Sequence, residues 1–118
     1  MNKKPEGLTL LIPAYNEEEL LASSVEYYHS YLTKLAKQGK ISDFEIIICV
    51  NGSKDHTAQA AEELSKKYRN TSFFETKRKG IGTALTLGII KAKKENITYM
   101  PGDAEYDASF IDNALEVM

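Results

Sequence analysis

Short apolar runs of strand length alternate along this chain with longer segments whose apolar residues recur at helical spacing. LTLLI at 8–12 and FEIIICV at 44–50 read as buried strands, whereas the apolar positions of residues 17–37 repeat every three or four residues. The alternation predicts strands at 8–12, 44–50, 71–75 and 96–100 and helices at 17–37, 57–68, 82–94 and 108–118. This order favours an α/β fold with a Rossmann-like parallel sheet, right-handed crossovers and helices on both faces.

Length and composition narrow the class of protein. The 118 residues suffice for one domain with its own core, so we expect a single domain over residues 1–118. A net charge of −2, with Lys and Arg spread along the chain, does not indicate a nucleic-acid partner. The N-terminal MNKKPEG lacks the apolar segment of a signal peptide, and the single cysteine, Cys49, fits a reducing compartment. We therefore expect a cytoplasmic protein, peripheral to the membrane at most in a longer parent protein.

Polar turns follow all four predicted strands. They are PAYNEE (13–18), NGSKD (51–55), KRKG (77–80) and PGDAEYD (101–107). In an open parallel sheet these turns share one edge, where ligands bind. Ordinary structural roles are also open: Asn16 and Glu19 can form a capping box, Ser53 or Asp55 can cap the second helix, and residues 77–80 can be a solvated loop.

The last turn carries three carboxylates within five residues. Asp107 precedes a predicted helix and is most simply its N-cap. Asp103 and Glu105 have no such local role, and two carboxylates brought close repel each other unless a cation or a proton lies between them. Hard oxygen ligands suit Mg²⁺ or Mn²⁺, so these two acids either bind such an ion or face water.

Four blocks of the sequence resemble family 2 glycosyltransferases of the GT-A fold, most of all dolichol-phosphate mannose synthase and similar polyprenyl-phosphate sugar transferases. The blocks are LLIPAYNEEE (10–19), FEIIICVNGSKDHTAQAAEEL (44–64), KGIGTALTLGIIKA (79–92) and GDAEYD (102–107). They cover nearly the whole chain in the right order. The resemblance implies inverting transfer of a sugar from a GDP- or UDP-sugar, with Mg²⁺ or Mn²⁺, to an acceptor such as a polyprenyl phosphate.

The resemblance also implies roles for individual residues. Against the nucleoside and its base it places Pro13, Tyr15, Glu17, Cys49 and Asn51, and near the rest of the donor Lys79, Gly80, Asp103, Ala104 and Glu105, with Asp103 and Glu105 as metal ligands. The chain departs from the family pattern at two points. Val50-Asn51 stands where paired aspartates are usual, which bears on base preference, and Glu105 stands where the metal motif has its second aspartate, which bears on metal choice.

The family's catalytic domain continues past residue 118, and its acceptor site and general base are expected in that later part. We therefore expect this chain to be the donor-binding part of a domain truncated at its C-terminus, weakly active or inactive alone, and able to form a homodimer through the exposed apolar side of its last helix. The alternative function is a non-catalytic binding or self-association module that retains the fold. A phospho-receiver domain also gathers acids at strand ends, but it needs an aspartate closing a central strand, whereas the third strand here ends in Glu75-Thr76.

Overall fold

The computed structural model describes residues 5–52, 55–77 and 81–100. Strands and helices alternate as the sequence predicts. The elements are β1 (Leu8–Ala14), α1 (Leu21–Lys37), β2 (Phe44–Asn51), α2 (Thr57–Lys67), β3 (Thr71–Thr76), α3 (Ile81–Lys91) and β4 (Asn96–Tyr99). The helix predicted at 108–118 lies outside the described residues. In the part of the chain that the structure describes, no helix has the length and apolar content needed to cross a membrane.

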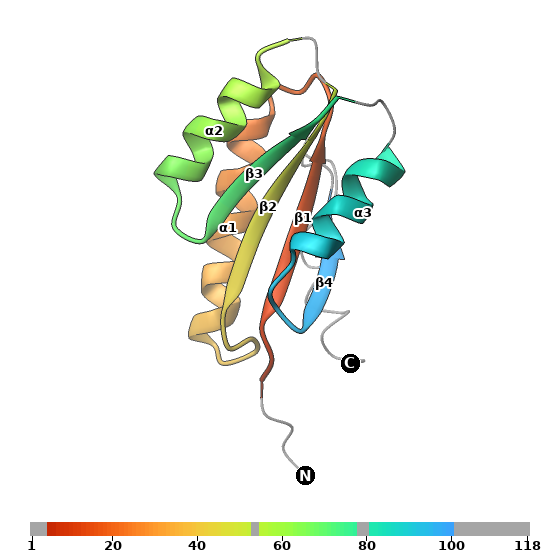
Figure 1. The fold of residues 1–118 in the computed structure, drawn as a ribbon. Helices are drawn as coiled ribbons and strands as arrows, with labels where there is room; N and C mark the ends of the chain where they lie inside the picture. Colours follow the sequence, from red (N-terminus) through yellow and green to blue (C-terminus); the bar gives the residue numbers. More distant parts are fainter. Residues whose placement is uncertain (1–4, 53–54, 78–80, 101–118) are drawn as a thin grey trace.

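The four strands form one parallel sheet in the order β3-β2-β1-β4. The chain moves outward from β1 to β2 and β3, and then crosses back to place β4 on the other side of β1. Because both directions use right-handed crossovers, the first two helices cover one face and α3 covers the other (Figure 1). The α/β prediction with helices on both faces is confirmed. In the flavodoxin-like order of a phospho-receiver β1 lies beside β3, so this strand order excludes that alternative.

Each face of the sheet has its own apolar cluster. The larger cluster joins the even-numbered side chains of β1 and β2 to α1 and α2. Its largest fully buried members are Tyr28, Leu10, Ile12, Leu21, Leu32, Leu35, Ile41, Ile46 and Ile48. The smaller cluster lies under α3 and contains Leu11, Ile47, Cys49 and Ala84. Since burial of a large aliphatic side chain contributes about 1.5–3 kcal/mol, the larger cluster supplies most of the apolar driving force.

The first helix begins later than the sequence predicts. Residue Asn16 has a φ of 50°, in the left-handed region that Asn tolerates better than most residues. The carbonyl of Glu17 then accepts the N–H groups of Leu20 and Leu21, which starts the helix at Leu21. The capping box predicted for Asn16 and Glu19 is therefore wrong, because a left-handed residue four positions before the N-cap cannot serve as that cap.

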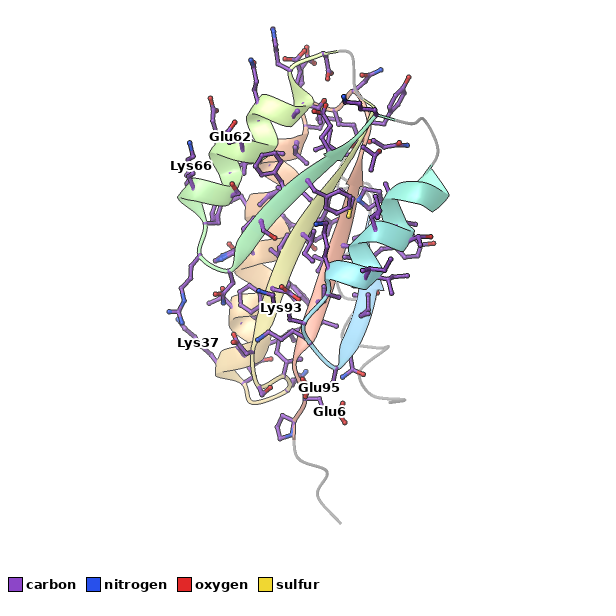
Figure 2. The ribbon with its side chains drawn as sticks, in the orientation of Figure 1. Glu6, Lys37, Glu62, Lys66, Lys93 and Glu95 are labelled. Carbon is purple, nitrogen blue, oxygen red and sulfur yellow. The ribbon has the colours of Figure 1, made fainter. Side chains whose placement is uncertain are left out.

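Polar side chains connect the starts of the strands, at the amino-terminal edge of the sheet. Asp43 precedes β2, and its carboxylate accepts hydrogen bonds from the Phe44 N–H at 2.8 Å and the Lys94 ammonium at 3.2 Å. These two partners, in that order, lower the pKa of Asp43. Glu6 and Glu95 lie at the same edge, where β1 and β4 begin (Figure 2).

We expect Gly88→Val in α3 to lower the free energy of unfolding by about 1–3 kcal/mol, because overpacking a close contact forces its neighbours to move. A Cβ at Gly88 would lie 3.0 Å from the Cys49 Sγ and 3.1 Å from the Leu11 Cδ2. The matched control is Ile89→Val, on the exposed side of the same helix, with an expected change under about 0.5 kcal/mol. Urea denaturation measures both, and equal stabilities would contradict the packing described.

We expect stability to fall as the pH drops below about 4, in part through Asp43. Its pKa is lower in the folded chain, so the unfolded chain takes up the proton first as the pH falls. The stabilisation is therefore present above the unfolded pKa and is lost as the pH falls through the folded pKa. Thermal melts between pH 2 and 7 should show a shallower acid limb for Asp43→Asn than for the control Glu63→Gln on α2, and identical limbs would refute this role.

Candidate functional site

The carboxyl ends of the first three strands meet at one edge of the sheet. Ala14 pairs with Val50 in the β1–β2 register, and Asn51 pairs with Thr76 in the β2–β3 register. The carboxyl ends of these three strands therefore lie side by side (Figure 1). β4 is parallel to β1 and runs toward the same edge, but the turn that follows it, 101–107, lies outside the described residues.

The strand order reverses between β1 and β4, and Pro13 lies at this point. The N–H of Met100 donates to the Leu11 carbonyl at 3.0 Å, as the last described bond between the two strands. Peptide groups alternate in direction along a strand, so Pro13, two residues further on, faces β4 as well. Since proline has no N–H, it cannot extend the ladder on that side. Crevices at such reversals are the usual ligand sites of open α/β sheets.

The turn after β1 borders a small acidic cleft. Tyr15 is 42% exposed, and Glu17 is half-buried. The cleft has a volume of about 210 Å³ and is lined by Asn16, Glu17, Glu18, Glu19, Leu20 and Asp55. Four of these six residues are acids, so the cleft can accept hydrogen bonds or attract a cation, while it disfavours a bare phosphate.

Thr57, at the start of α2, joins this turn to the turn after β2. Its hydroxyl accepts the N–H of Glu17 at 2.9 Å and donates to the Asp55 carboxylate, which also accepts the Thr57 N–H at 3.0 Å. Burial favours the neutral form of Asp55, but hydrogen bonds from Thr57 and from the Glu18 backbone outweigh it and lower the pKa of this carboxyl. Asp55 thus accepts the N–H of the first residue of α2, but the N-cap itself is His56, so Asp55 is not the cap that was predicted, and Ser53 lies outside the described residues. Thr57 was not among the predicted site residues.

A second link joins the ends of β2 and β3. Asn51 is only 7% exposed, and its side-chain oxygen accepts the Thr76 hydroxyl at 3.3 Å. Gly52 follows with a φ of 55° and donates its N–H to the Thr76 carbonyl at 2.8 Å. The predicted base contact Asn51 therefore lies at the shared edge, held by the neighbouring strand.

The structure places Cys49 elsewhere. Its side chain has no exposed surface and packs beneath α3, in contact range of Gly88 and Leu11. Burial raises the pKa of its thiol to about 12. The alternation of side chains along β2 directs Cys49 into the core on the α3 side. We therefore do not assign the Cys49 side chain a contact with the base of a donor.

The remaining predicted residues cannot be placed. Lys79, Gly80, Asp103, Ala104 and Glu105 all lie outside the described residues. Within the described ranges, no group of three or more His, Cys, Asp or Glu side chains is arranged to hold a metal ion. Whether the acids at 103 and 105 approach Tyr15 and Asn51 therefore stays a prediction.

A larger cleft lies at the opposite edge of the sheet. It has a volume of about 630 Å³ and is bordered by the starts of β2 and β3, the end of α2 and the segment after α3. Its basic residues are Lys66, Lys67, Arg69, Lys93 and Lys94. Lys66 is also paired with Glu62 on the outer surface of α2 at 3.4 Å (Figure 2). This cleft is remote from the carboxyl ends of the strands, so size alone does not identify the site.

Thiol labelling tests the placement of Cys49. In the folded chain we expect a thiol reagent at pH 8 to react at a rate set by unfolding, because the thiol is buried and its pKa is about 12. In denaturant the same cysteine should react at the rate of a free thiol, and its being the single cysteine makes the signal unambiguous. Fast labelling of the native chain would place Cys49 at the surface.

Residues 9–118 match the family model described as "Glycosyl transferase family 2". The human dolichyl-phosphate beta-glucosyltransferase is 32% identical over 108 residues, covering 89% of this chain and 33% of the relative. The dolichol-phosphate mannosyltransferase of Pyrococcus furiosus is 28% identical over 111 residues, covering 94% of this chain and 30% of that relative. The chain thus spans about a third of the length of the curated relatives it matches.

Solved structures agree on the fold. The mannosyltransferase PcManGT from Pyrobaculum calidifontis, in complex with GDP-Man and Mn²⁺, superimposes with a TM-score of 0.73 at 22% identity, covering 95% of this chain and 32% of that one. TarS of S. aureus gives a TM-score of 0.65 at 21% identity, covering 93% of this chain and 31% of that one. The chain has the fold of these GT-A glycosyltransferases, and the match over residues 9–118 shows that the chain belongs to glycosyl transferase family 2.

Proposed function

We propose that this chain binds a nucleotide-diphosphate sugar, a GDP- or UDP-sugar, at the carboxyl edge of its sheet, as the donor-binding part of an inverting glycosyltransferase. The observation that carries the proposal is the strand-order reversal between β1 and β4, flanked by the exposed Tyr15 turn. A relative named for dolichyl phosphate and a neighbour that holds GDP-Man support the ligand classes.

In this proposal the nucleoside lies along the turns after β1 and β2. The Tyr15 ring offers a flat, exposed surface on which a base can stack. The half-buried Glu17 carboxylate can accept hydrogen bonds from ribose hydroxyls or a base amino group, and the Asn51 amide can read a base edge. At about 210 Å³ the acidic cleft is smaller than the roughly 300–1,000 Å³ of typical ligand pockets, so it holds the neutral part of the donor at most.

A divalent cation, Mg²⁺ or Mn²⁺, would be held by Asp103 and Glu105. Carboxylates are the hard ligands that both ions prefer, and the described rim is already acidic, so an anionic diphosphate needs a cation beside it. When bound, the metal offsets the charge that develops on the leaving diphosphate. The chain's own contribution is to hold the nucleoside and to supply the two carboxylates.

For the acceptor we propose a lipid phosphate such as a polyprenyl phosphate. A phosphate is already ionised at neutral pH, so its attack on the sugar needs little help from a general base. Any general base is assigned to a part of the enzyme outside this chain. With such an acceptor, we propose that the protein acts in the cytoplasm, peripheral to a membrane.

Titration calorimetry with GDP- and UDP-sugars, with and without Mn²⁺, tests the donor site. We expect Mn²⁺-dependent binding of one donor, weakened on the order of tenfold or more by Asp103→Ala, which is about 1.4 kcal/mol. The control Glu63→Ala removes an exposed acid of α2 and should bind as the wild type does. Binding that ignores both Mn²⁺ and Asp103→Ala would refute the proposed metal site.

A self-association module is the second candidate, favoured by apolar side chains left exposed on α3 and β4. They are Leu87, Ile89, Ile90, Ile97 and Tyr99, between 36% and 72% exposed. A self-association module forms a dimer whose dissociation constant is the same with and without nucleotide and metal. In a chain that binds the donor, the dissociation constant depends on these ligands. Sedimentation velocity with and without GDP, UDP and Mn²⁺ distinguishes the two.

A further inference from the structure

We propose that Thr57 and Asp55 are positioning residues, which hold the turn after β1 in the shape that receives the nucleoside. Neither residue was predicted to contact the donor, and the inference rests on the proposed function. Thr57 joins the turn after β1 to the turn after β2. The hydrogen bond between Glu17 and Thr57 connects residues that are 40 apart in the sequence.

Glu17 is fixed through its backbone in both directions. Its N–H donates to the Thr57 hydroxyl at 2.9 Å, and its carbonyl accepts the N–H of Leu20 at 3.1 Å and of Leu21 at 2.9 Å. The first bond fastens the turn to the start of α2, and the other two start α1. Because both peptide groups of Glu17 are held, the direction in which its side chain leaves the backbone is set before any ligand arrives.

The chemistry at residue 57 requires a hydroxyl. This side chain must accept one hydrogen bond, from the Glu17 N–H, and donate another, to the Asp55 carboxylate. Thr57 has no exposed surface, so water cannot readily replace either partner. Serine can make both bonds, whereas valine, with nearly the same shape, can make neither.

Asp55 completes the link as an ionised acceptor. Its Oδ1 accepts both the hydroxyl and the N–H of Thr57, and the Glu18 backbone N–H also supports the charged carboxylate. Asp55 also lines the same cleft as Glu17. One carboxylate thus orients the Thr57 hydroxyl, and that hydroxyl orients the donor-facing turn.

The turn after β1 lies outside regular secondary structure, and Glu18 in the same turn also pairs with His56 before α2 at 3.4 Å. Tyr15 is exposed, Asn16 is in a left-handed conformation, and regular helix begins only at Leu21. A left-handed non-glycine residue persists where its surroundings favour it. Without the anchor at Glu17, the ring and the carboxylate that face the donor would sample more orientations, and binding would bear the entropy of ordering them.

Thr57→Val, Thr57→Ser and Asp55→Asn test the link, with Thr33→Val as the matched control. Thr33 also donates a hydroxyl hydrogen bond, to the His29 carbonyl at 2.8 Å, but within α1 and away from the edge. Amide hydrogen exchange at Glu17, melting temperature, and affinity for the GDP- or UDP-sugar with Mn²⁺ are measured for each variant. The exchange measurement needs no ligand.

In Thr57→Val we expect Glu17 exchange to rise about tenfold and donor affinity to fall about three- to thirtyfold. Asp55→Asn should move both quantities in the same direction by less, and Thr57→Ser should restore both to within about twofold of wild type. Thr33→Val should lower the melting temperature. It should leave the donor affinity unchanged, and also the Glu17 exchange rate once that rate is corrected for global stability. That pattern separates positioning from a general loss of stability.

Three results would overturn the inference while the wild type still binds the donor: unchanged Glu17 exchange in Thr57→Val, unchanged affinity in Thr57→Val, or a Thr57→Ser variant as impaired as Thr57→Val. A wild-type chain that binds no donor, with or without Mn²⁺, instead contradicts the proposed function itself, and the positioning role falls with it. The two failures are therefore distinguished by the wild-type titration alone.

Discussion

The double pairing of β1 is the constraint on which the rest of the structure depends. This strand is buried along its whole length and bonds to β2 on one side and β4 on the other. The chain must therefore reverse its direction of travel across the sheet beside β1, and right-handed crossovers then assign α3 to the face opposite α1 and α2. Pro13 has no N–H to donate on the β4 side, so β1 offers no donor to β4 at this residue.

Charge is distributed unequally between the two edges of the sheet. The last turns of the helices carry Lys34, Lys37, Lys66, Lys67 and Lys91, which interact favourably with the negative ends of the helix dipoles. The opposite edge carries the acids of the small cleft, near the positive ends of the same helices. Helix electrostatics thus account for two of the five basic residues of the larger cleft, Lys66 and Lys67, without a ligand, while the acidic edge is suited to neutral polar groups and cations.

The sequence predicted the fold well because its apolar runs and helical spacings are long and distinct. It failed at Asn16, where capping chemistry also suits a left-handed turn residue, and the structure uses the second option. It did not show that Cys49 is buried under α3, because a continuous apolar run such as IIICV does not reveal which side chains face which layer. Thr57 could not be found from local pattern, since its partner Glu17 is distant in sequence and the signal is a tertiary hydrogen bond.

The link through Thr57 is one of two hydrogen-bonded links between neighbouring segments at the carboxyl edge of the sheet. The ends of β2 and β3 are joined by Asn51 and Thr76, and the turns after β1 and β2 by Glu17 and Thr57. Each link uses a buried polar group whose partner belongs to a neighbouring turn or strand, so the turns do not adjust independently. We therefore expect a change at the start of α2 to affect the Tyr15 turn through these hydrogen bonds, although α2 itself packs on β3 and the larger core cluster. Residues that determine donor affinity are then expected among those that hold the turns as well as those that face the ligand.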